Sequence, residues 1–240
     1  MFWKEPTGLK NIPLSSKIGI SILLITAGIG YLLGFANIYL SYSPADEQPG
    51  ISVQDIRITF YGAREKTTLE KAIDGSMRGY FSDEAGYQAT KDWIAAGAPE
   101  SGFPRIKEIF DASCSTCHSA DAQVAGVVTE TYDDVAQYLQ QDTGKPVSRL
   151  VSLSHTHVLG TLAVMFVLIF IFSFTLYKEW IKIVVITFSS LAIPVDIGSW
   201  WLAKLSGALA PLVILGGLTM ALSFAALILL SLYELWIRKA

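Results

Sequence analysis

"IGISILLITAGIGYLLGFANIYL", residues 18–40, is an apolar run that contains no charged side chain. A helix of this length rises far enough to cross the hydrocarbon core of a bilayer. A secretory signal peptide is the alternative, but its apolar region is normally shorter. We therefore interpret residues 18–42 as a retained membrane anchor that follows a short N-terminal segment, residues 1–17.

Three more apolar spans follow near the end of the chain, at residues 157–177, 181–203 and 208–236. The stretch between the anchor and these spans is too charged for lipid, because residues 43–149 contain 17 acidic and 10 basic side chains, a net charge of 10 minus 17, or −7. The sequence predicts a mainly α protein with four transmembrane helices, one N-terminal and three C-terminal. A small, mostly helical domain at 43–152 precedes a three-helix transmembrane domain at 153–240.

Basic side chains gather at one set of span ends and predict the orientation of the chain. They are Lys4, Lys10, Lys17, Lys178, Lys182, Arg238 and Lys239. The opposite connection, near residues 206–207, has only Lys204 beside it. By the positive-inside rule both termini are cytoplasmic, so the 43–152 domain faces outward. We expect a multi-pass protein of the bacterial inner membrane with this domain in the periplasm.

Within the outer domain, residues 41–50 have the Ser, Pro and Gly content of a linker. The alternation in "ISVQDIRITFYG", residues 51–62, predicts a short strand. Helical spacing begins after Thr67, where Leu69, Ile73 and Met77 recur every four residues and Thr68 is a candidate cap. Two further helices are predicted at 82–96 and 105–112, the second of which leads into Cys114.

Cys114 and Cys117 are the only cysteines of the chain, and His118 follows them directly. This spacing is that of covalent haem attachment, in which each thiol forms a thioether with the porphyrin and the histidine binds the iron. A redox dithiol would require a βαβ context, and a zinc site would require two further ligands. The sequence therefore predicts one haem c, with His118 as an axial iron ligand.

The stretch "IKEIFDASCSTCHSAD", residues 106–121, resembles the opening of a small c-type cytochrome, where an amphipathic helix leads into the attachment motif. The layout of the whole chain resembles membrane-anchored monohaem cytochromes that are subunits of respiratory complexes. The resemblance implies a helical haem fold and an electron-transfer role. It also implies redox partner proteins, among them other subunits of a membrane complex.

The sixth iron ligand has three candidates. His155 and His157, in "LSHTHVLG", are expected where the outer domain meets the second span, and a histidine there is our preferred ligand. They stand two residues apart and point about 200° apart on a helix, so only one of them could reach a given iron. Met77 is the alternative ligand.

Asp196 is an acid inside the third apolar span, flanked by Pro194 and Gly198. Ionisable groups at membrane depth are commonly paired or functional. We expect His157 to begin the neighbouring span at the same side of the membrane. The two residues form a candidate proton or quinone site, and the alternative is an acid satisfied locally by a serine, the backbone or a partner subunit.

These features favour an electron-transfer protein over an enzyme, because iron changes oxidation state without a catalytic acid or nucleophile and we identify none. Three alternatives stay open. They are a quinol-oxidising enzyme component that uses His157 and Asp196, a haem-based gas sensor, and a structural subunit of a larger complex. Nothing in the sequence points to nucleic acid.

Overall fold

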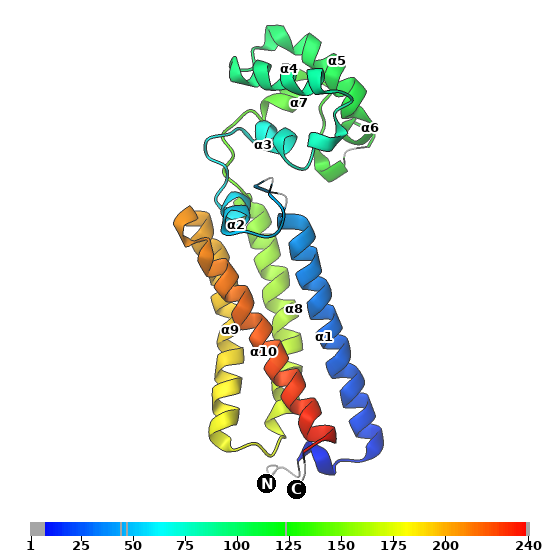
Figure 1. The fold of residues 1–240 in the computed structure, drawn as a ribbon, viewed down its shortest axis with the longest axis vertical. Helices are drawn as coiled ribbons and strands as arrows, with labels where there is room; N and C mark the ends of the chain where they lie inside the picture. The colour runs from blue at the N-terminus through cyan, green and yellow to red at the C-terminus, as the bar shows by residue number, and fades with distance from the viewer. Residues whose placement is uncertain (1–7, 44, 47, 123, 239–240) are drawn as a thin grey trace. The chain divides into compact units, whose positions relative to one another are not determined.

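The computed structural model describes residues 8–43, 45–46, 48–122 and 124–238, and it divides the chain into two compact units (Figure 1). One unit, the membrane unit, joins the chain up to Ser41 with the chain from Pro146 onward. The other, the inserted unit, is Tyr42–Lys145. The expected boundary between residues 152 and 153 falls inside a helix of the membrane unit.

The membrane unit contains four long helices, which Figure 1 labels α1 (Leu14–Tyr42), α8 (Val147–Ser173), α9 (Glu179–Leu205) and α10 (Pro211–Trp236). Each is long and apolar enough to cross a membrane. Large apolar side chains remain exposed along them, including Leu32, Leu40 and Phe166. Such an apolar surface is suited to lipid rather than to water. The prediction of a mainly α protein with one N-terminal and three C-terminal transmembrane helices is confirmed.

The start of α8 differs from the prediction. We expected the span at 157–177, but the helix begins ten residues earlier, directly after Pro146, and ends at Ser173. Its first turns, "VSRLVSLS", mix polar and apolar side chains and therefore lack the signal of a membrane span. Consequently His155 and His157 lie more than two turns inside the helix, and the expectation that they mark its beginning was wrong.

Apolar side chains of α8, α9 and α10 form the core of the membrane unit, with Leu24 contributed by α1. The buried members include Met165, Leu168, Phe172, Ala192, Ile193, Phe224 and Leu227. Short 3-10 segments precede two of the long helices, η1 (Leu9–Asn11) before α1 and η5 (Gly207–Leu209) before α10. Gly8 permits a close approach beside η1, because a Cβ there would lie 2.6 Å from the Leu176 side chain.

The described residues of the inserted unit contain six shorter helices. They are α2 (Val53–Phe60), α3 (Thr68–Asp74), α4 (Glu84–Ala95), α5 (Phe103–Ser113), α6 (Ser115–His118) and α7 (Tyr132–Ala136), with 3-10 turns η2 (Arg78–Tyr80), η3 (Glu100–Gly102) and η4 (Val124–Gly126). The described part of the chain contains no strand, only an isolated antiparallel bridge between Thr67 and Gln141.

The predicted strand at 51–62 is wrong, because these residues form α2. Ser52 caps the helix and accepts a hydrogen bond from the N–H of Asp55, whose carboxylate in turn accepts one from the N–H of Ser52. This capping box fixes the first turn of a helix. Ile56, Ile58 and Phe60 are all buried, so burial alone fits the alternation as well as a helix, and the capping box decides for the helix.

Asp142 ties the two ends of the inserted unit together. Its buried carboxylate accepts hydrogen bonds from the N–H groups of Ala63 at 2.7 Å and Gly144 at 3.0 Å. Gly62 and Gly144 both have positive φ, and their backbones nearly touch, because a Cβ on Gly62 would lie 2.3 Å from the Asp142 carbonyl oxygen. Only glycine allows this crossing.

Candidate functional site

Helix α5 carries the chain into the two cysteines. Phe103, Ile106 and Phe110 recur at three- and four-residue spacing, and all three are buried. They pack in one apolar cluster with side chains of α3, α4 and α7, including Ile73, Trp93, Ile94 and Val135. The end of α5 is therefore held by the core of the inserted unit.

Cys117 and His118 lie on a single helical turn, α6, and Cys114 is its N-cap residue. The carbonyl oxygen of Cys114 accepts hydrogen bonds from the N–H of Cys117 at 3.1 Å and from the N–H of His118 at 2.9 Å. Both cysteines are free thiols. Cys114 is half-buried against the apolar cluster and Cys117 is exposed. Burial raises the pKa of the Cys114 thiol to about 11.

His118 contains a polar atom without a partner. Its Nδ1 is buried and makes no hydrogen bond, one of three such side-chain atoms in the described residues. The backbone of His118 is fixed, because its carbonyl oxygen accepts a hydrogen bond from the N–H of Thr129 at 3.0 Å. Buried polar atoms in finished structures nearly always have a partner, so the imidazole is placed as if another group belonged beside it.

These residues fit a covalently bound haem. Two free thiols and an imidazole on one turn are the donor set that the attachment chemistry requires, and the unpartnered Nδ1 shows that the protein chain alone leaves the imidazole unsatisfied. In the described part of the chain no group of three or more His, Cys, Asp or Glu side chains is arranged to hold a metal ion. A haem iron does not need such a group, because the porphyrin supplies four of its ligands.

Met77 lies outside the helix on which we expected it. Helix α3 ends at Asp74, with Gly75 as its C-cap, and its N-cap is Thr67 rather than Thr68. Because α3 has only seven residues and ends at the glycine that follows it, Met77 lies in the turn before η2.

The far end of the Met77 segment, at Ser82, is hydrogen-bonded to the residues that precede Cys114. Ser82 donates a hydrogen bond through its hydroxyl to the carbonyl oxygen of Ala112 at 3.1 Å, and its N–H donates to the hydroxyl of Ser113 at 3.1 Å. Ala112 and Ser113 immediately precede Cys114. The half-buried Met77 therefore belongs to a loop whose end is fixed beside the motif.

His155 and His157 belong to the membrane unit, whereas His118 belongs to the inserted unit. Both are exposed on α8. The His157 ring meets the Trp200 ring of α9 edge to face, with centroids 5.2 Å apart. One turn earlier, Ser154 accepts a hydrogen bond from the indole N–H of Trp201 at 3.0 Å. His157 is thus part of the contact between α8 and α9.

Asp196 lies at a close approach between α9 and α10. A Cβ on Gly216 of α10 would lie 2.8 Å from the Asp196 Cα and 3.1 Å from its Oδ1. Trp200 donates a side-chain hydrogen bond to Asp196, so one indole contacts both Asp196 and His157. The hydroxyl of Tyr31, from α1, donates to the carbonyl oxygen of Gly217, the next residue of α10, at 3.3 Å.

Glu234 is a buried acid that our sequence analysis missed. Its carboxylate is fully buried in α10 and accepts hydrogen bonds from the N–H groups of Leu9 at 3.2 Å and Leu176 at 2.8 Å. Arg238, one turn later, lies 3.0 Å away in an ion pair. The four-residue spacing of an acid and an arginine at the end of an apolar span was the available signal.

Residues 131–240 match a family described as a transmembrane helical domain. The match covers the last three spans and leaves Cys114, Cys117 and His118 outside it. No curated protein and no solved structure matches the chain. The similarity therefore supports the membrane part of the architecture and does not bear on the chemistry of the inserted unit.

Proposed function

We propose that this protein transfers electrons through a single haem c that is covalently attached to the inserted unit. The observation that carries the proposal is the turn α6, where two free thiols stand beside a histidine whose buried Nδ1 has no partner. Cys114 and Cys117 form the thioethers, and His118 is an axial ligand. When bound, the haem supplies a one-electron couple that the surrounding protein tunes.

For the sixth ligand we now favour Met77 over the membrane histidines. The Met77 loop belongs to the same unit as His118 and is fixed at Ser82 beside the attachment motif. His157 already packs against Trp200 in the membrane unit, which leaves His155 as the alternative histidine. A thioether ligand gives the iron a higher reduction potential than a second imidazole would.

The proposed setting is the bacterial inner membrane. An even number of spans would leave both chain ends on one side of the membrane and the inserted unit on the other, and the basic side chains favour cytoplasmic ends. The inserted unit would then face the periplasm. The excess of acidic side chains in residues 43–149 would speed encounters with a basic redox partner at low salt.

Haem-linked peroxidase staining after denaturing electrophoresis tests this function. The protein is expressed in a bacterial host that carries a c-type cytochrome maturation system. The wild-type band should stain, and a Cys114→Ser, Cys117→Ser double variant should not stain at equal protein amount. His155→Ala is the matched control and should stain like the wild type. A wild-type band without stain would contradict the proposal.

Oxidation of quinol is a second candidate function, favoured by the contact of Trp200 with both Asp196 and His157. In this reading Asp196 would accept one proton from the quinol at membrane depth for each electron that the haem takes up, so full oxidation to the quinone, which releases two protons and two electrons, needs two such transfers. Asp196→Asn should abolish haem reduction by a soluble quinol analogue while haem content stays the same. Ser199→Ala, at the buried neighbouring serine, is the control. Equal reduction rates in wild type and Asp196→Asn would exclude this role.

A further inference from the structure

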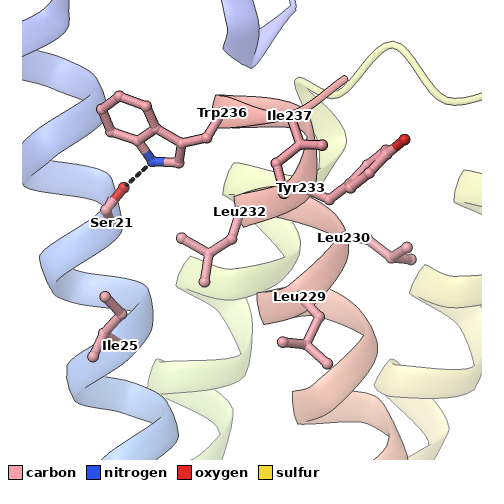
Figure 2. A pocket seen from close by; sticks show the side chains of 8 residues that line it. All are labelled: Ser21, Ile25, Leu229, Leu230, Leu232, Tyr233, Trp236 and Ile237. Atoms are coloured by element: carbon pink, nitrogen blue, oxygen red, sulfur yellow. Dashed lines mark hydrogen bonds between the residues drawn. The ribbon is translucent and has the colours of Figure 1, made fainter. Parts of the chain in front are cut away.

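An open groove of about 590 Å³ lies between α1 and the end of α10 (Figure 2). Its walls are almost entirely apolar. The lining side chains are Ser21 and Ile25 from α1, with Leu229, Leu230, Leu232, Tyr233, Trp236 and Ile237 from the end of α10 and the residue that follows it. All of them belong to the membrane unit.

Two contacts between α1 and α10 bracket this groove. At one end the indole N–H of Trp236 donates to the Ser21 hydroxyl at 2.9 Å, as Figure 2 shows. Ten residues further along α1, nearly three turns, Tyr31 stacks on Phe224 with ring centroids 4.7 Å apart. Between these contacts the helices leave the groove open. Only 6% of the residues in the most apolar stretch of α1 are buried.

A cationic and aromatic rim stands at the Trp236 end. The Lys17 ammonium lies 5.6 Å from the centroid of the Trp236 ring and donates one hydrogen bond, to the carbonyl oxygen of Leu235 at 3.1 Å. An ammonium group has three N–H donors. Tryptophan and lysine at the end of a membrane helix are typical of the headgroup level.

We propose that this groove binds one anionic phospholipid, with an acyl chain along Ile25, Leu229 and Leu232 and the phosphate beside Lys17. An apolar groove open to the bilayer must be filled by apolar matter, and the positive charge at its rim selects a negative headgroup. The occupant adds a contact between α1 and α10 beside Leu24, which packs into the core of the membrane unit. This site is independent of the haem and of the proposed electron transfer.

Native mass spectrometry of the full-length protein in detergent tests the proposal. The added lipids are phosphatidylglycerol and phosphatidylcholine with identical acyl chains. Wild type should bind phosphatidylglycerol about fivefold more tightly, because one basic group near a headgroup contributes on the order of a factor of five. Lys17→Gln should bind both lipids with the lower affinity.

A second pair of variants tests the groove itself. Leu229→Trp fills it and should weaken the binding of both lipids, whereas Leu218→Trp, an equally exposed leucine of α10 outside the groove, should not. Equal affinity of wild type for the two lipids would overturn the proposal. Equal lipid affinities of Leu229→Trp and Leu218→Trp would overturn it as well. So would dimers of the wild type in detergent that are lost in Leu229→Trp, because the occupant of the groove would then be a second copy of the chain.

Discussion

The imidazole of His157 meets the indole of Trp200 edge to face, with ring centroids 5.2 Å apart. This contact belongs to the packing of α8 on α9. We expect His157→Ala to leave the visible spectrum of the haem unchanged. The variant should lower the free energy of unfolding of the membrane unit by about 1 kcal/mol, the contribution of such a ring pair. Loss of six-coordinate absorption in His157→Ala would show that this histidine binds the iron after all.

Met77→Ala should convert a six-coordinate haem into a five-coordinate one that binds carbon monoxide rapidly. Met77→His should restore six-coordination and lower the reduction potential, because imidazole replaces the thioether. Visible and magnetic circular dichroism spectra with a redox titration provide the measurement. His155→Ala is the control, and a five-coordinate spectrum in that variant, with Met77→Ala unchanged, would assign the ligand to His155.

Glu234→Ala should destabilise the membrane unit by about 3–5 kcal/mol, because it leaves the Arg238 charge and two backbone N–H groups without their buried acceptor. Glu234→Gln should cost less, since the amide oxygen still accepts a hydrogen bond. Glu179→Ala removes an exposed acid that pairs with Lys182 and should change stability by less than about 1 kcal/mol. Thermal unfolding in detergent, followed by circular dichroism, measures the three differences. Equal melting temperatures for Glu234→Ala and Glu179→Ala would contradict the role of Glu234.

Asp74 should make the inserted unit sensitive to acid. Burial acts to raise the pKa of this carboxyl, but hydrogen bonds from Lys66, Tyr87 and Lys91 outweigh it, so the pKa lies below its ordinary value of 3.8. Because the pKa of Asp74 is lowered in the folded state, the ionised carboxylate contributes its full stabilisation at pH values above the ordinary pKa. This stabilisation is lost as the pH falls through the folded-state pKa. The difference in unfolding free energy between wild type and Asp74→Asn should therefore be constant above pH 5, about 2 kcal/mol, and shrink below pH 4.

Near-UV circular dichroism between pH 3 and pH 7 measures this difference for Asp74. Asp111→Asn is the control, because Asp111 forms an exposed pair with Lys107 on the same unit. That variant should differ little from wild type throughout the range. A difference between wild type and Asp74→Asn that grows as the pH falls would have the wrong sign.

Gly62→Ala should destabilise the inserted unit by roughly 1–3 kcal/mol, because the position has φ +102° and its Cβ would overlap the backbone at Asp142. Gly50 also has a positive φ, of +95°, but a Cβ there meets nothing within 4 Å. Gly50→Ala therefore isolates the cost of the backbone angle. Thermal melts of the two variants should differ, and equal melting temperatures would show that the crossing of Gly62 and Gly144 tolerates a side chain.

The membrane helices and α5 could be predicted from sequence, because long apolar runs and regular apolar spacing report directly on burial in lipid or in a core. Two of the sequence predictions, the strand at 51–62 and the start of the second span, were wrong because the pattern of polar and apolar residues there is ambiguous. The segment that forms α2 alternates like a strand, and only the capping box at Ser52 and Asp55 decides for a helix. The first turns of α8 contain polar side chains, so the apolar pattern that predicts a membrane span starts later than the helix, which begins directly after Pro146.

Contacts between distant segments could not be predicted from the sequence. Nothing in the chain alone indicates that Trp200 contacts His157, or that Glu234 accepts hydrogen bonds from Leu9 and Leu176. These contacts depend on how the helices pack and not on local spacing. The cysteines and His118, in contrast, are neighbours in sequence, so their grouping on α6 follows from the motif itself.

Intact mass spectrometry of the denatured protein, after extraction with acidified acetone, tests the covalent haem most directly. A haem bound through Cys114 and Cys117 resists extraction, so the polypeptide should stay coloured and exceed its sequence mass of 26.2 kDa by one haem. Digestion should place the added mass on the peptide that contains both cysteines. A colourless polypeptide with the bare sequence mass, produced in cells that mature c-type cytochromes, would contradict the account.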